Sequence, residues 1–173
     1  GVTDQVVEVA ANGFERAGYA FVGWNTAADG SGQAYAAGAG YALTAGDDAL
    51  FAQWTPNDGT AYTVNHYKVN AAHTAATLDN AENLNATTDT VVEATAQTIP
   101  GYTYQPLFDE NDMKTVASGT VAGDGSLVLN LYYTPDADAL AYHANGGQGT
   151  MAATEGVTDQ VVEVAANGFE RAG

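Results

Sequence analysis

Residues 121–133 read VAGDGSLVLNLYY, and this stretch carries the clearest fold signal in the chain. Its Gly-Asp-Gly at 123–125 is a sequence typical of tight turns. Every second residue after the turn is apolar or aromatic, which in a strand places these side chains on one face: Leu127, Leu129, Leu131 and Tyr133. The stretch therefore predicts a tight turn that leads into a strand with one buried face.

Other short runs of β-branched and aromatic residues, bounded by Gly or Asp, predict further strands. They lie at 5–9, 19–24, 49–54, 62–69 and 90–96. Only residues 71–86 have a composition compatible with a helix, and their Asn and Thr content disfavours one. We expect a mainly β fold with little helix.

The charge balance is strongly acidic. The 173 residues include four basic and 21 acidic residues, which gives a net charge of −17. Such a surface repels phosphate, so nucleic acid and anionic membranes are poor partners. The 46% hydrophobic content is high enough for a folded core.

Cysteine and long apolar segments are both missing from the sequence. The absence of cysteine excludes disulfides, thiolate zinc sites and cysteine nucleophiles. Without a long apolar run we expect no membrane-spanning helix. The opening GVTDQ has no basic start and no apolar region, so any export signal is expected outside this piece.

The sequence contains a perfect internal repeat. Residues 1–18 read GVTDQVVEVAANGFERAG, and residues 156–173 are identical, which gives a period of 155 residues. Repeats of this kind are typical of arrays in which each unit follows the last. Arg171 and three acidic residues belong to the second copy, so one period carries a charge of −15. An array of such units would be soluble and self-repelling.

Two clusters of turn residues divide the period into modules. One follows Trp54 (TPNDG), and the other follows Tyr133 (TPDAD). We therefore predict five segments: 1–55, the C-terminal part of one module; 56–60, a linker; 61–134, a complete second module; 135–138, a linker; and 139–173, the N-terminal part of the next copy of the first module.

The first module resembles the Listeria–Bacteroides repeat, the internalin-type B repeat. The resemblance rests on GYAFVGWNT at 18–26, DGSG at 29–32, Tyr41, Leu43 and LFAQW at 50–54, and on YHANGG at 142–147 for the opening strand. It covers nearly all of 139–173 and 1–55. The spaced aromatic signatures make it specific.

The second module is similar to MucBP-like mucin-binding repeats. The matching features are YTVNHYK at 62–68, IPGYT at 99–103 and LNLYYTP at 129–135. Both resemblances imply small β-grasp-like modules strung along secreted, wall-anchored bacterial adhesins. They also imply an extracellular location at the bacterial cell surface.

No cluster of residues predicts catalysis, a cofactor or a metal. His66, His73 and His143 are the only histidines, and none stands at ligand spacing from another. Residues 29–32 and 109–112 are acidic but lack the layout of a calcium loop. We interpret both as solvated turns. No nucleophile elbow, P-loop or H-E-x-x-H motif is present, so we expect no enzyme, no cofactor and no metal site.

Two further hypotheses concern individual side chains. Trp24 and Trp54 are expected to pack in a core, with stacking on sugars as the alternative. Lys68 and Asn130 lie on the first and last strands of their module, with Glu93 between them in sequence. An isopeptide bond between that lysine and that asparagine is the sharper hypothesis, and two ordinary strand residues are the simpler one.

The phase of the repeat gives a hypothesis about pairing. The segment 1–55 lacks the opening strand of its module, while 139–146 is an opening strand without its module. An unpaired sheet edge recruits a matching strand. We therefore expect 139–146 to pair with the 1–55 sheet, either within the chain or in a neighbouring repeat or second copy.

Two functional classes follow. The preferred one is a non-enzymatic spacer that projects the binding tip of a bacterial surface adhesin. The alternative is a module, at 61–134, that binds mucin, a host glycan or a host receptor. Exposure of most tyrosines in that module would favour binding, and their burial would favour the spacer: Tyr62, Tyr67, Tyr102, Tyr104, Tyr132 and Tyr133.

Overall fold

The computed structural model describes residues 5–173 of the chain. Every regular element in this part of the chain is a strand, so the predicted mainly β fold is confirmed. The β-grasp detail stays a prediction. The described chain forms two compact units. The first contains the chain up to Tyr62 with 85–92 and 120–127, and the second contains 63–84, 93–119 and 128–173.

In the first unit, a three-stranded antiparallel sheet forms in the order β3-β2-β5, and a two-stranded ladder joins β1 to β4. The strands are β1 (Val6–Glu8), β2 (Tyr19–Asn25), β3 (Ala34–Tyr35), β4 (Gly40–Ala42) and β5 (Phe51–Pro56). β2 and β5 shift register between Phe21 and Gly23, and Gly23 has a φ of 152°. This bulge lies beside Trp24, which is buried at the end of the sheet.

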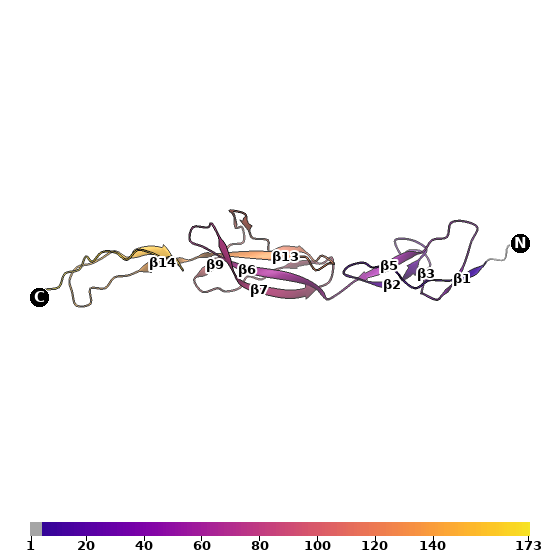
Figure 1. Cartoon of the computed structure of the whole chain (residues 1–173), viewed down its shortest axis with the longest axis horizontal. Helices are drawn as coiled ribbons and strands as arrows, with labels where there is room; N and C mark the ends of the chain where they lie inside the picture. Colours follow the sequence, from indigo (N-terminus) through magenta and orange to yellow (C-terminus); the bar gives the residue numbers. More distant parts are fainter. Residues whose placement is uncertain (1–4) are drawn as a thin grey trace. The chain divides into compact units, whose positions relative to one another are not determined.

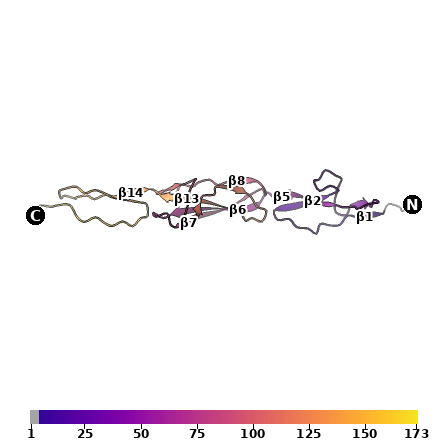
Figure 2. The ribbon, with the colours of Figure 1, turned by 90° about the horizontal axis from the view of Figure 1, so that it is seen from above.

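The central sheet has four strands in the order β7-β6-β13-β9 (Figures 1 and 2). These are β6 (Thr60–Val69), β7 (Ala76–Ala86), β9 (Tyr102–Tyr104) and β13 (Val128–Pro135). β6 and β13 run parallel, which requires a long connection between them. That connection includes four further short strands: β8 (Val91–Glu93), β10 (Asp109–Glu110), β11 (Met113–Lys114) and β12 (Ser118–Thr120). They form two small ladders, in which β8 pairs with β12 and β10 pairs with β11.

The core lies on one face of this sheet, as the alternation in β13 predicts. Leu129, Leu131 and Tyr133 have no exposed surface, while Leu127 precedes the strand and is half-buried. The Gly-Asp-Gly turn is also confirmed, because the Gly125 amide donates to the Ala122 carbonyl at 2.9 Å. However, the turn does not make a regular hairpin: β13 forms ladders with β6 and β9, and Val116, before the turn, makes a single antiparallel bridge to Asn130.

The segment 71–86, which has some helical character in sequence, contains the long strand β7. Most of its residues are polar or small and exposed, which suits a strand at the edge of a sheet. Strands also extend into both predicted linkers. β5 continues to Pro56 and β6 starts at Thr60, while β13 continues to Pro135 and β14 starts two residues later.

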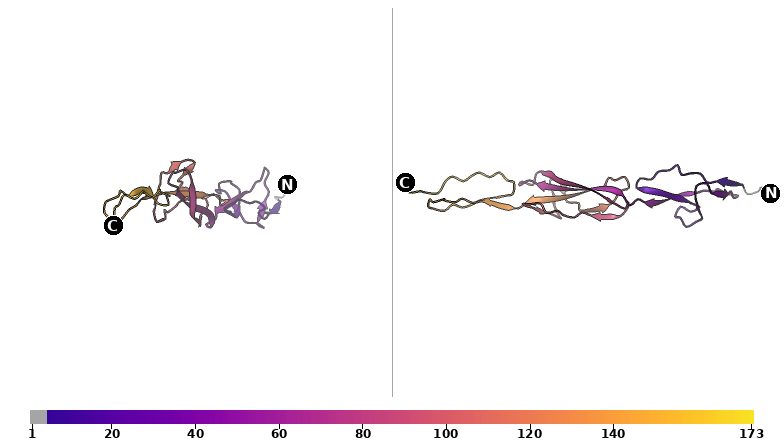
Figure 3. Two further views of the ribbon diagram at one scale, coloured as in Figure 1. Left: turned by 60° about the vertical axis from the view of Figure 1, so that its left-hand side comes forward. Right: turned by 90° about the horizontal axis from the view of Figure 1, so that it is seen from below.

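The final segment contradicts pairing of 139–146 with the 1–55 sheet within the chain, while pairing with a neighbouring repeat or a second copy stays a prediction. β14 (Ala137–Leu140) pairs antiparallel with β15 (Thr154–Val157), and within the described residues 139–146 makes no ladder with any part of 5–55. A hairpin closed over 13 residues costs less loop entropy than pairing with a segment some 80 residues or more away. After β15 the chain continues without a regular strand (yellow in Figure 3).

Candidate functional site

His66 is a fully buried titratable side chain of the central sheet. It has no exposed surface, and both ring nitrogens have partners. Nε2 lies 2.7 Å from the Glu82 carboxylate, and Nδ1 lies 2.8 Å from the Tyr133 hydroxyl. That hydroxyl also accepts a hydrogen bond from the Gln97 amide at 2.9 Å. The hydrogen bonds satisfy both ring nitrogens, and they join three strands and the loop that carries Gln97.

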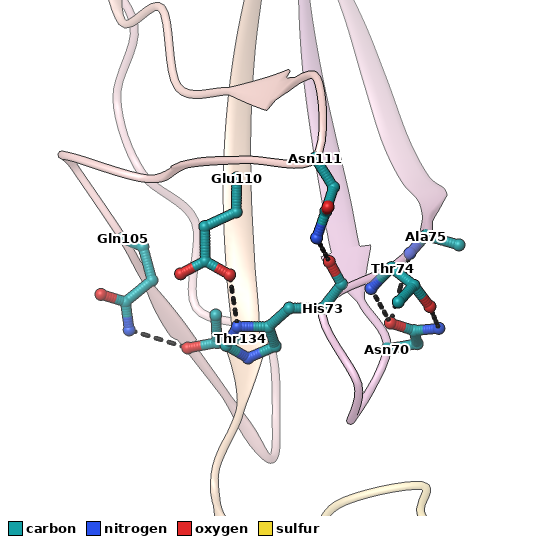
Figure 4. A network of polar contacts seen from close by, with 8 residues as sticks. All are labelled: Asn70, His73, Thr74, Ala75, Gln105, Glu110, Asn111 and Thr134. Carbon is teal, nitrogen blue, oxygen red and sulfur yellow. Dashed lines mark hydrogen bonds and ion pairs between the residues drawn. The ribbon is translucent and has the colours of Figure 1, made fainter.

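A second polar network lies at one end of the sheet (Figure 4). The His73 Nδ1 atom lies 2.9 Å from the Glu110 carboxylate, and the Asn111 side chain donates to the His73 carbonyl at 2.7 Å. His73 and Asn111 both have positive φ, at 55° and 49°. Asn70 closes the neighbouring turn by accepting the Thr74 amide at 2.8 Å.

This network covers a small hydrophobic cluster. Val69, Phe108 and Met113 are buried together, and the His73 ring meets the Phe108 ring edge-on at 5.8 Å. The contacts tie the β6–β7 turn to the β10–β11 turn over that cluster. A histidine–carboxylate pair could serve as a base, and here the His73 ring packs against Phe108.

The two acidic segments form closed turns. In 29–32, the Ser31 hydroxyl and amide donate to Asp29, and these hydrogen bonds hold the pKa of the Asp29 carboxyl below its ordinary value. In 109–112, Asp109 pairs with Lys114 at 2.8 Å. Among residues 5–173, no group of three or more His, Asp or Glu side chains lies close enough to hold a metal ion.

The isopeptide hypothesis is wrong in its geometry. Asn130 is paired in register with Asn65, whose side chain donates to it at 3.1 Å. Lys68 stands opposite Tyr133, three positions further along, and therefore on the other face of the sheet. Its ammonium group pairs with Asp79 at 2.8 Å. A lysine and an asparagine on opposite faces cannot form a bond.

The tryptophans are in or beside a core, as predicted. Trp24 is buried, its indole N–H donates to the Ala10 carbonyl at 3.0 Å, and Phe21 contacts both tryptophan rings. Trp54 is half-buried. Neither ring is presented as an open platform for stacking on a sugar.

The six tyrosines of the central module are also covered. Tyr62 and Tyr133 are buried, and the other four are half-buried: Tyr67, Tyr102, Tyr104 and Tyr132. Tyr67 stacks on Tyr132 with ring centroids 5.1 Å apart. Burial raises the pKa of the Tyr132 hydroxyl and, likewise, that of Tyr133. These rings serve packing and leave little free aromatic surface.

Comparison with known proteins gives one distant relative. A protein of Evansella cellulosilytica named "Putative membrane protein" is 29% identical to this chain over 126 residues. The aligned region covers 64% of this chain and 19% of that protein, so the chain spans about a fifth of the relative. No family model matches the chain, and no solved structure matches it. Within residues 5–173, no helix is long and apolar enough to cross a bilayer.

The sequence pointed to the buried histidine but not to the side chains that hydrogen-bond to it. Glu82, which contacts the buried His66, lies in the segment with weak helical character, so nothing in the sequence placed it across from β6. The alternation of Tyr62, Val64 and His66 did carry a signal, because it puts the histidine on the core face.

Proposed function

We propose that the chain is a non-enzymatic spacer unit of a tandem array in an extracellular bacterial surface adhesin. The observation that carries the proposal is the perfect repeat of 1–18 at 156–173, seen in two complementary settings. In the first copy, β1 pairs with β4 and Val9 is 5% exposed. In the second copy, Val164 takes the place of Val9 and is 68% exposed.

The second copy pairs at its start, where Gly156 and Val157 belong to β15. These settings support the proposal that the opening hairpin at 137–157 and the strands in 5–56 are two parts of one module. In a periodic array the two parts would be continuous, and one segment of each period would make both sets of contacts. A repeating structural unit explains this arrangement.

The burial of the tyrosines favours the spacer function and disfavours a mucin-binding or glycan-binding module. Sugar-binding proteins present exposed rings for stacking, and the six rings of the central module are buried or half-buried. The charge of −15 per period supports an extended, soluble array, because neighbouring units repel one another.

The test uses a correctly phased unit, which starts at residue 137 and continues from residue 155 into residues 1–136. This protein would be titrated onto a panel of mucins, deglycosylated mucins and host surface glycoproteins. We expect no saturable binding at high micromolar concentration. Saturable binding that is lost on deglycosylation would replace the spacer with the glycan-binding alternative.

A further inference from the structure

The two links between modules carry similar short sequences, Thr-Pro followed by Asn or Asp. Thr55-Pro56-Asn57 ends the first module, and Thr134-Pro135-Asp136 ends the second. Each proline is the last residue of its strand, and each is paired in register with a tyrosine that follows a glycine: Tyr19 with Pro56, and Tyr102 with Pro135. The structure shows that the likeness extends to the contacts around the linker residue.

At the first link, Asn57 is held from both sides. Its amide donates to the Gly18 carbonyl at 2.8 Å, and its carbonyl accepts the Thr88 amide at 3.0 Å. The Tyr19 hydroxyl donates to the carboxylate of Asp89. The glycine and tyrosine belong to the preceding module, and the threonine and aspartate belong to the following one.

At the second link, Asp136 has the same three contacts. Its amide donates to the Gly101 carbonyl at 2.8 Å, and its carbonyl accepts the Thr158 amide at 2.9 Å. The Tyr102 hydroxyl donates to the carboxylate of Asp159 at 2.8 Å. Again the Gly-Tyr pair precedes the link, and the Thr-Asp pair follows it.

The backbone conformations match as well. Gly18 and Gly101 have φ values of 77° and 76°, and Asp89 and Asp159 have φ values of 65° and 59°. A Cβ atom on Gly101 would lie 2.6 Å from the Thr158 methyl group, and one on Gly18 would lie 2.7 Å from the Thr88 hydroxyl. Both glycines are therefore required by conformation and by the close approach of the following module.

Basic side chains gather at the same place. The Arg16 guanidinium lies 3.7 Å from the centroid of the Tyr19 ring, and the Lys68 ammonium lies 5.2 Å from that of the Tyr102 ring. Only four basic residues occur in the sequence, and a third, Arg171, is the repeat copy of Arg16. A cation over each ring favours the tyrosine's position and offsets the local acidic charge.

We propose that these contacts form one interaction motif, a junction lock, through which each module binds any following module that presents a Thr-Asp turn. The lock consists of a Gly-Tyr pair, a Pro-Asn or Pro-Asp linker and a Thr-Asp turn. Each of the two locks lies inside one compact unit. The lock fixes the orientation of the two modules that it joins, at both kinds of junction in the period.

The repeat extends the motif to the next period. Thr3-Asp4 has the sequence of Thr158-Asp159 and lies outside the described residues. The same turn therefore recurs wherever a module of the first kind follows one of the second kind. The inference goes beyond the spacer proposal and does not depend on it, because a locked junction is equally compatible with a binding module.

The first experiment measures amide hydrogen exchange by NMR in the whole chain. Tyr102→Phe removes only the hydroxyl, and we expect exchange at the Thr158 amide to accelerate by about five-fold, the value of one hydrogen bond. The matched control is Tyr104→Phe, on the same strand, whose hydroxyl makes no hydrogen bond within residues 5–173. Exchange at the Leu131 amide reports whether the central sheet is intact.

A variant of the first lock and a glycine variant of the second complete the test. Tyr19→Phe should accelerate exchange at the Thr88 amide by a similar factor and leave Thr158 unchanged. Gly101→Ala should accelerate Thr158 more than Tyr102→Phe does, because the added Cβ separates the modules. Wild-type rates at Thr88 and Thr158 in both hydroxyl variants, or unprotected amides at these positions in the wild type, would overturn the proposal.

Residual dipolar couplings test the claim about orientation. In the wild type, a single alignment tensor should describe the amides of β9 and β13 together with those of β14 and β15. In Gly101→Ala two tensors should be needed. Two tensors in the wild type would refute a fixed orientation. Neither outcome bears on mucin binding, so failure of the lock and failure of the spacer proposal are distinguishable.

Discussion

Removal of the Tyr133 hydroxyl tests the buried network at the centre of the β6–β13 sheet. This side chain has no exposed surface. With the Nε2 proton of His66 directed at Glu82, the Nδ1 atom accepts the Tyr133 hydroxyl proton, and the hydroxyl oxygen accepts the Gln97 amide. This tautomer is assigned from the network, and it satisfies every partner. Tyr133→Phe keeps the aromatic ring and removes the hydroxyl that links His66 to the Gln97 amide.

The expected loss of stability follows from the buried polar atoms that the variant leaves without a partner. The Nδ1 atom of His66 would be a buried acceptor without a donor, which costs about 1–3 kcal/mol. Exchange at β13 amides that open by unfolding should therefore accelerate about 5- to 150-fold. The control is Tyr67→Phe, a half-buried ring that stacks on Tyr132 and whose hydroxyl makes no hydrogen bond in the described chain.

The reasoning is refuted if Tyr133→Phe and Tyr67→Phe accelerate exchange equally. A double-mutant cycle adds a second check, because the loss should depend on the histidine. In a His66→Leu background the phenylalanine variant leaves no orphaned Nδ1 atom. We expect its additional effect there to be smaller than in the wild type, and an unchanged effect would contradict the assigned network.

Other measurements address the cores and the tyrosines. Leu131→Ala removes a fully buried side chain and should lower the free energy of unfolding by about 2–5 kcal/mol in urea titrations followed by circular dichroism. The control is Val128→Ala on the same strand, where the valine is 45% exposed and the change should be less than about 1 kcal/mol. Equal losses in the two variants would contradict the assigned faces of the strand. Trp24→Phe removes one hydrogen bond to a backbone carbonyl and should lower the free energy of unfolding by about 0.5–1.5 kcal/mol beyond any packing change. The unfolding transition can be followed by the fluorescence of Trp54. An unchanged midpoint would show that this hydrogen bond does not stabilise the fold. Burial raises the pKa of Tyr102 and of Tyr132, so the folded chain keeps these protons to higher pH than the unfolded chain does. The stability that these two groups contribute should be full below about pH 10 and fall as the pH rises above it. A constant urea midpoint from about pH 8 to about pH 11 would contradict this expectation.

Much of the fold was predictable because strand signals are local. The alternation of Leu129, Leu131 and Tyr133 identified a buried face, and the Gly-Asp-Gly turn before it formed as expected. The pairing partner was not predictable, because alternation marks a face and says nothing about which strand lies alongside. β13 thus pairs in parallel with β6, which starts 68 residues earlier.

The polar contacts were less predictable, since they join residues far apart in sequence. Lys68 and Asn130 were suitable in type for a covalent bond, but the register places them three positions apart and on opposite faces. The junction lock likewise joins Gly-Tyr, Pro-Asn or Pro-Asp, and Thr-Asp segments. In sequence each of these is an ordinary turn signal, and only their meeting in space gives them a common role.

The two copies of the repeat separate what sequence determines from what tertiary structure decides. Asn12 and Asn167 close the same local turn: each side chain bonds to the amide and the carbonyl of the phenylalanine two residues on, at 2.9 Å in the first copy and 3.0 Å in the second. Val9 and Val164 differ, with exposures of 5% and 68%. The turn needs only neighbouring atoms, so sequence alone determines it. The first valine lies where its backbone bonds to Gly38 and Ala39, which are supplied by chain that folds back from further along.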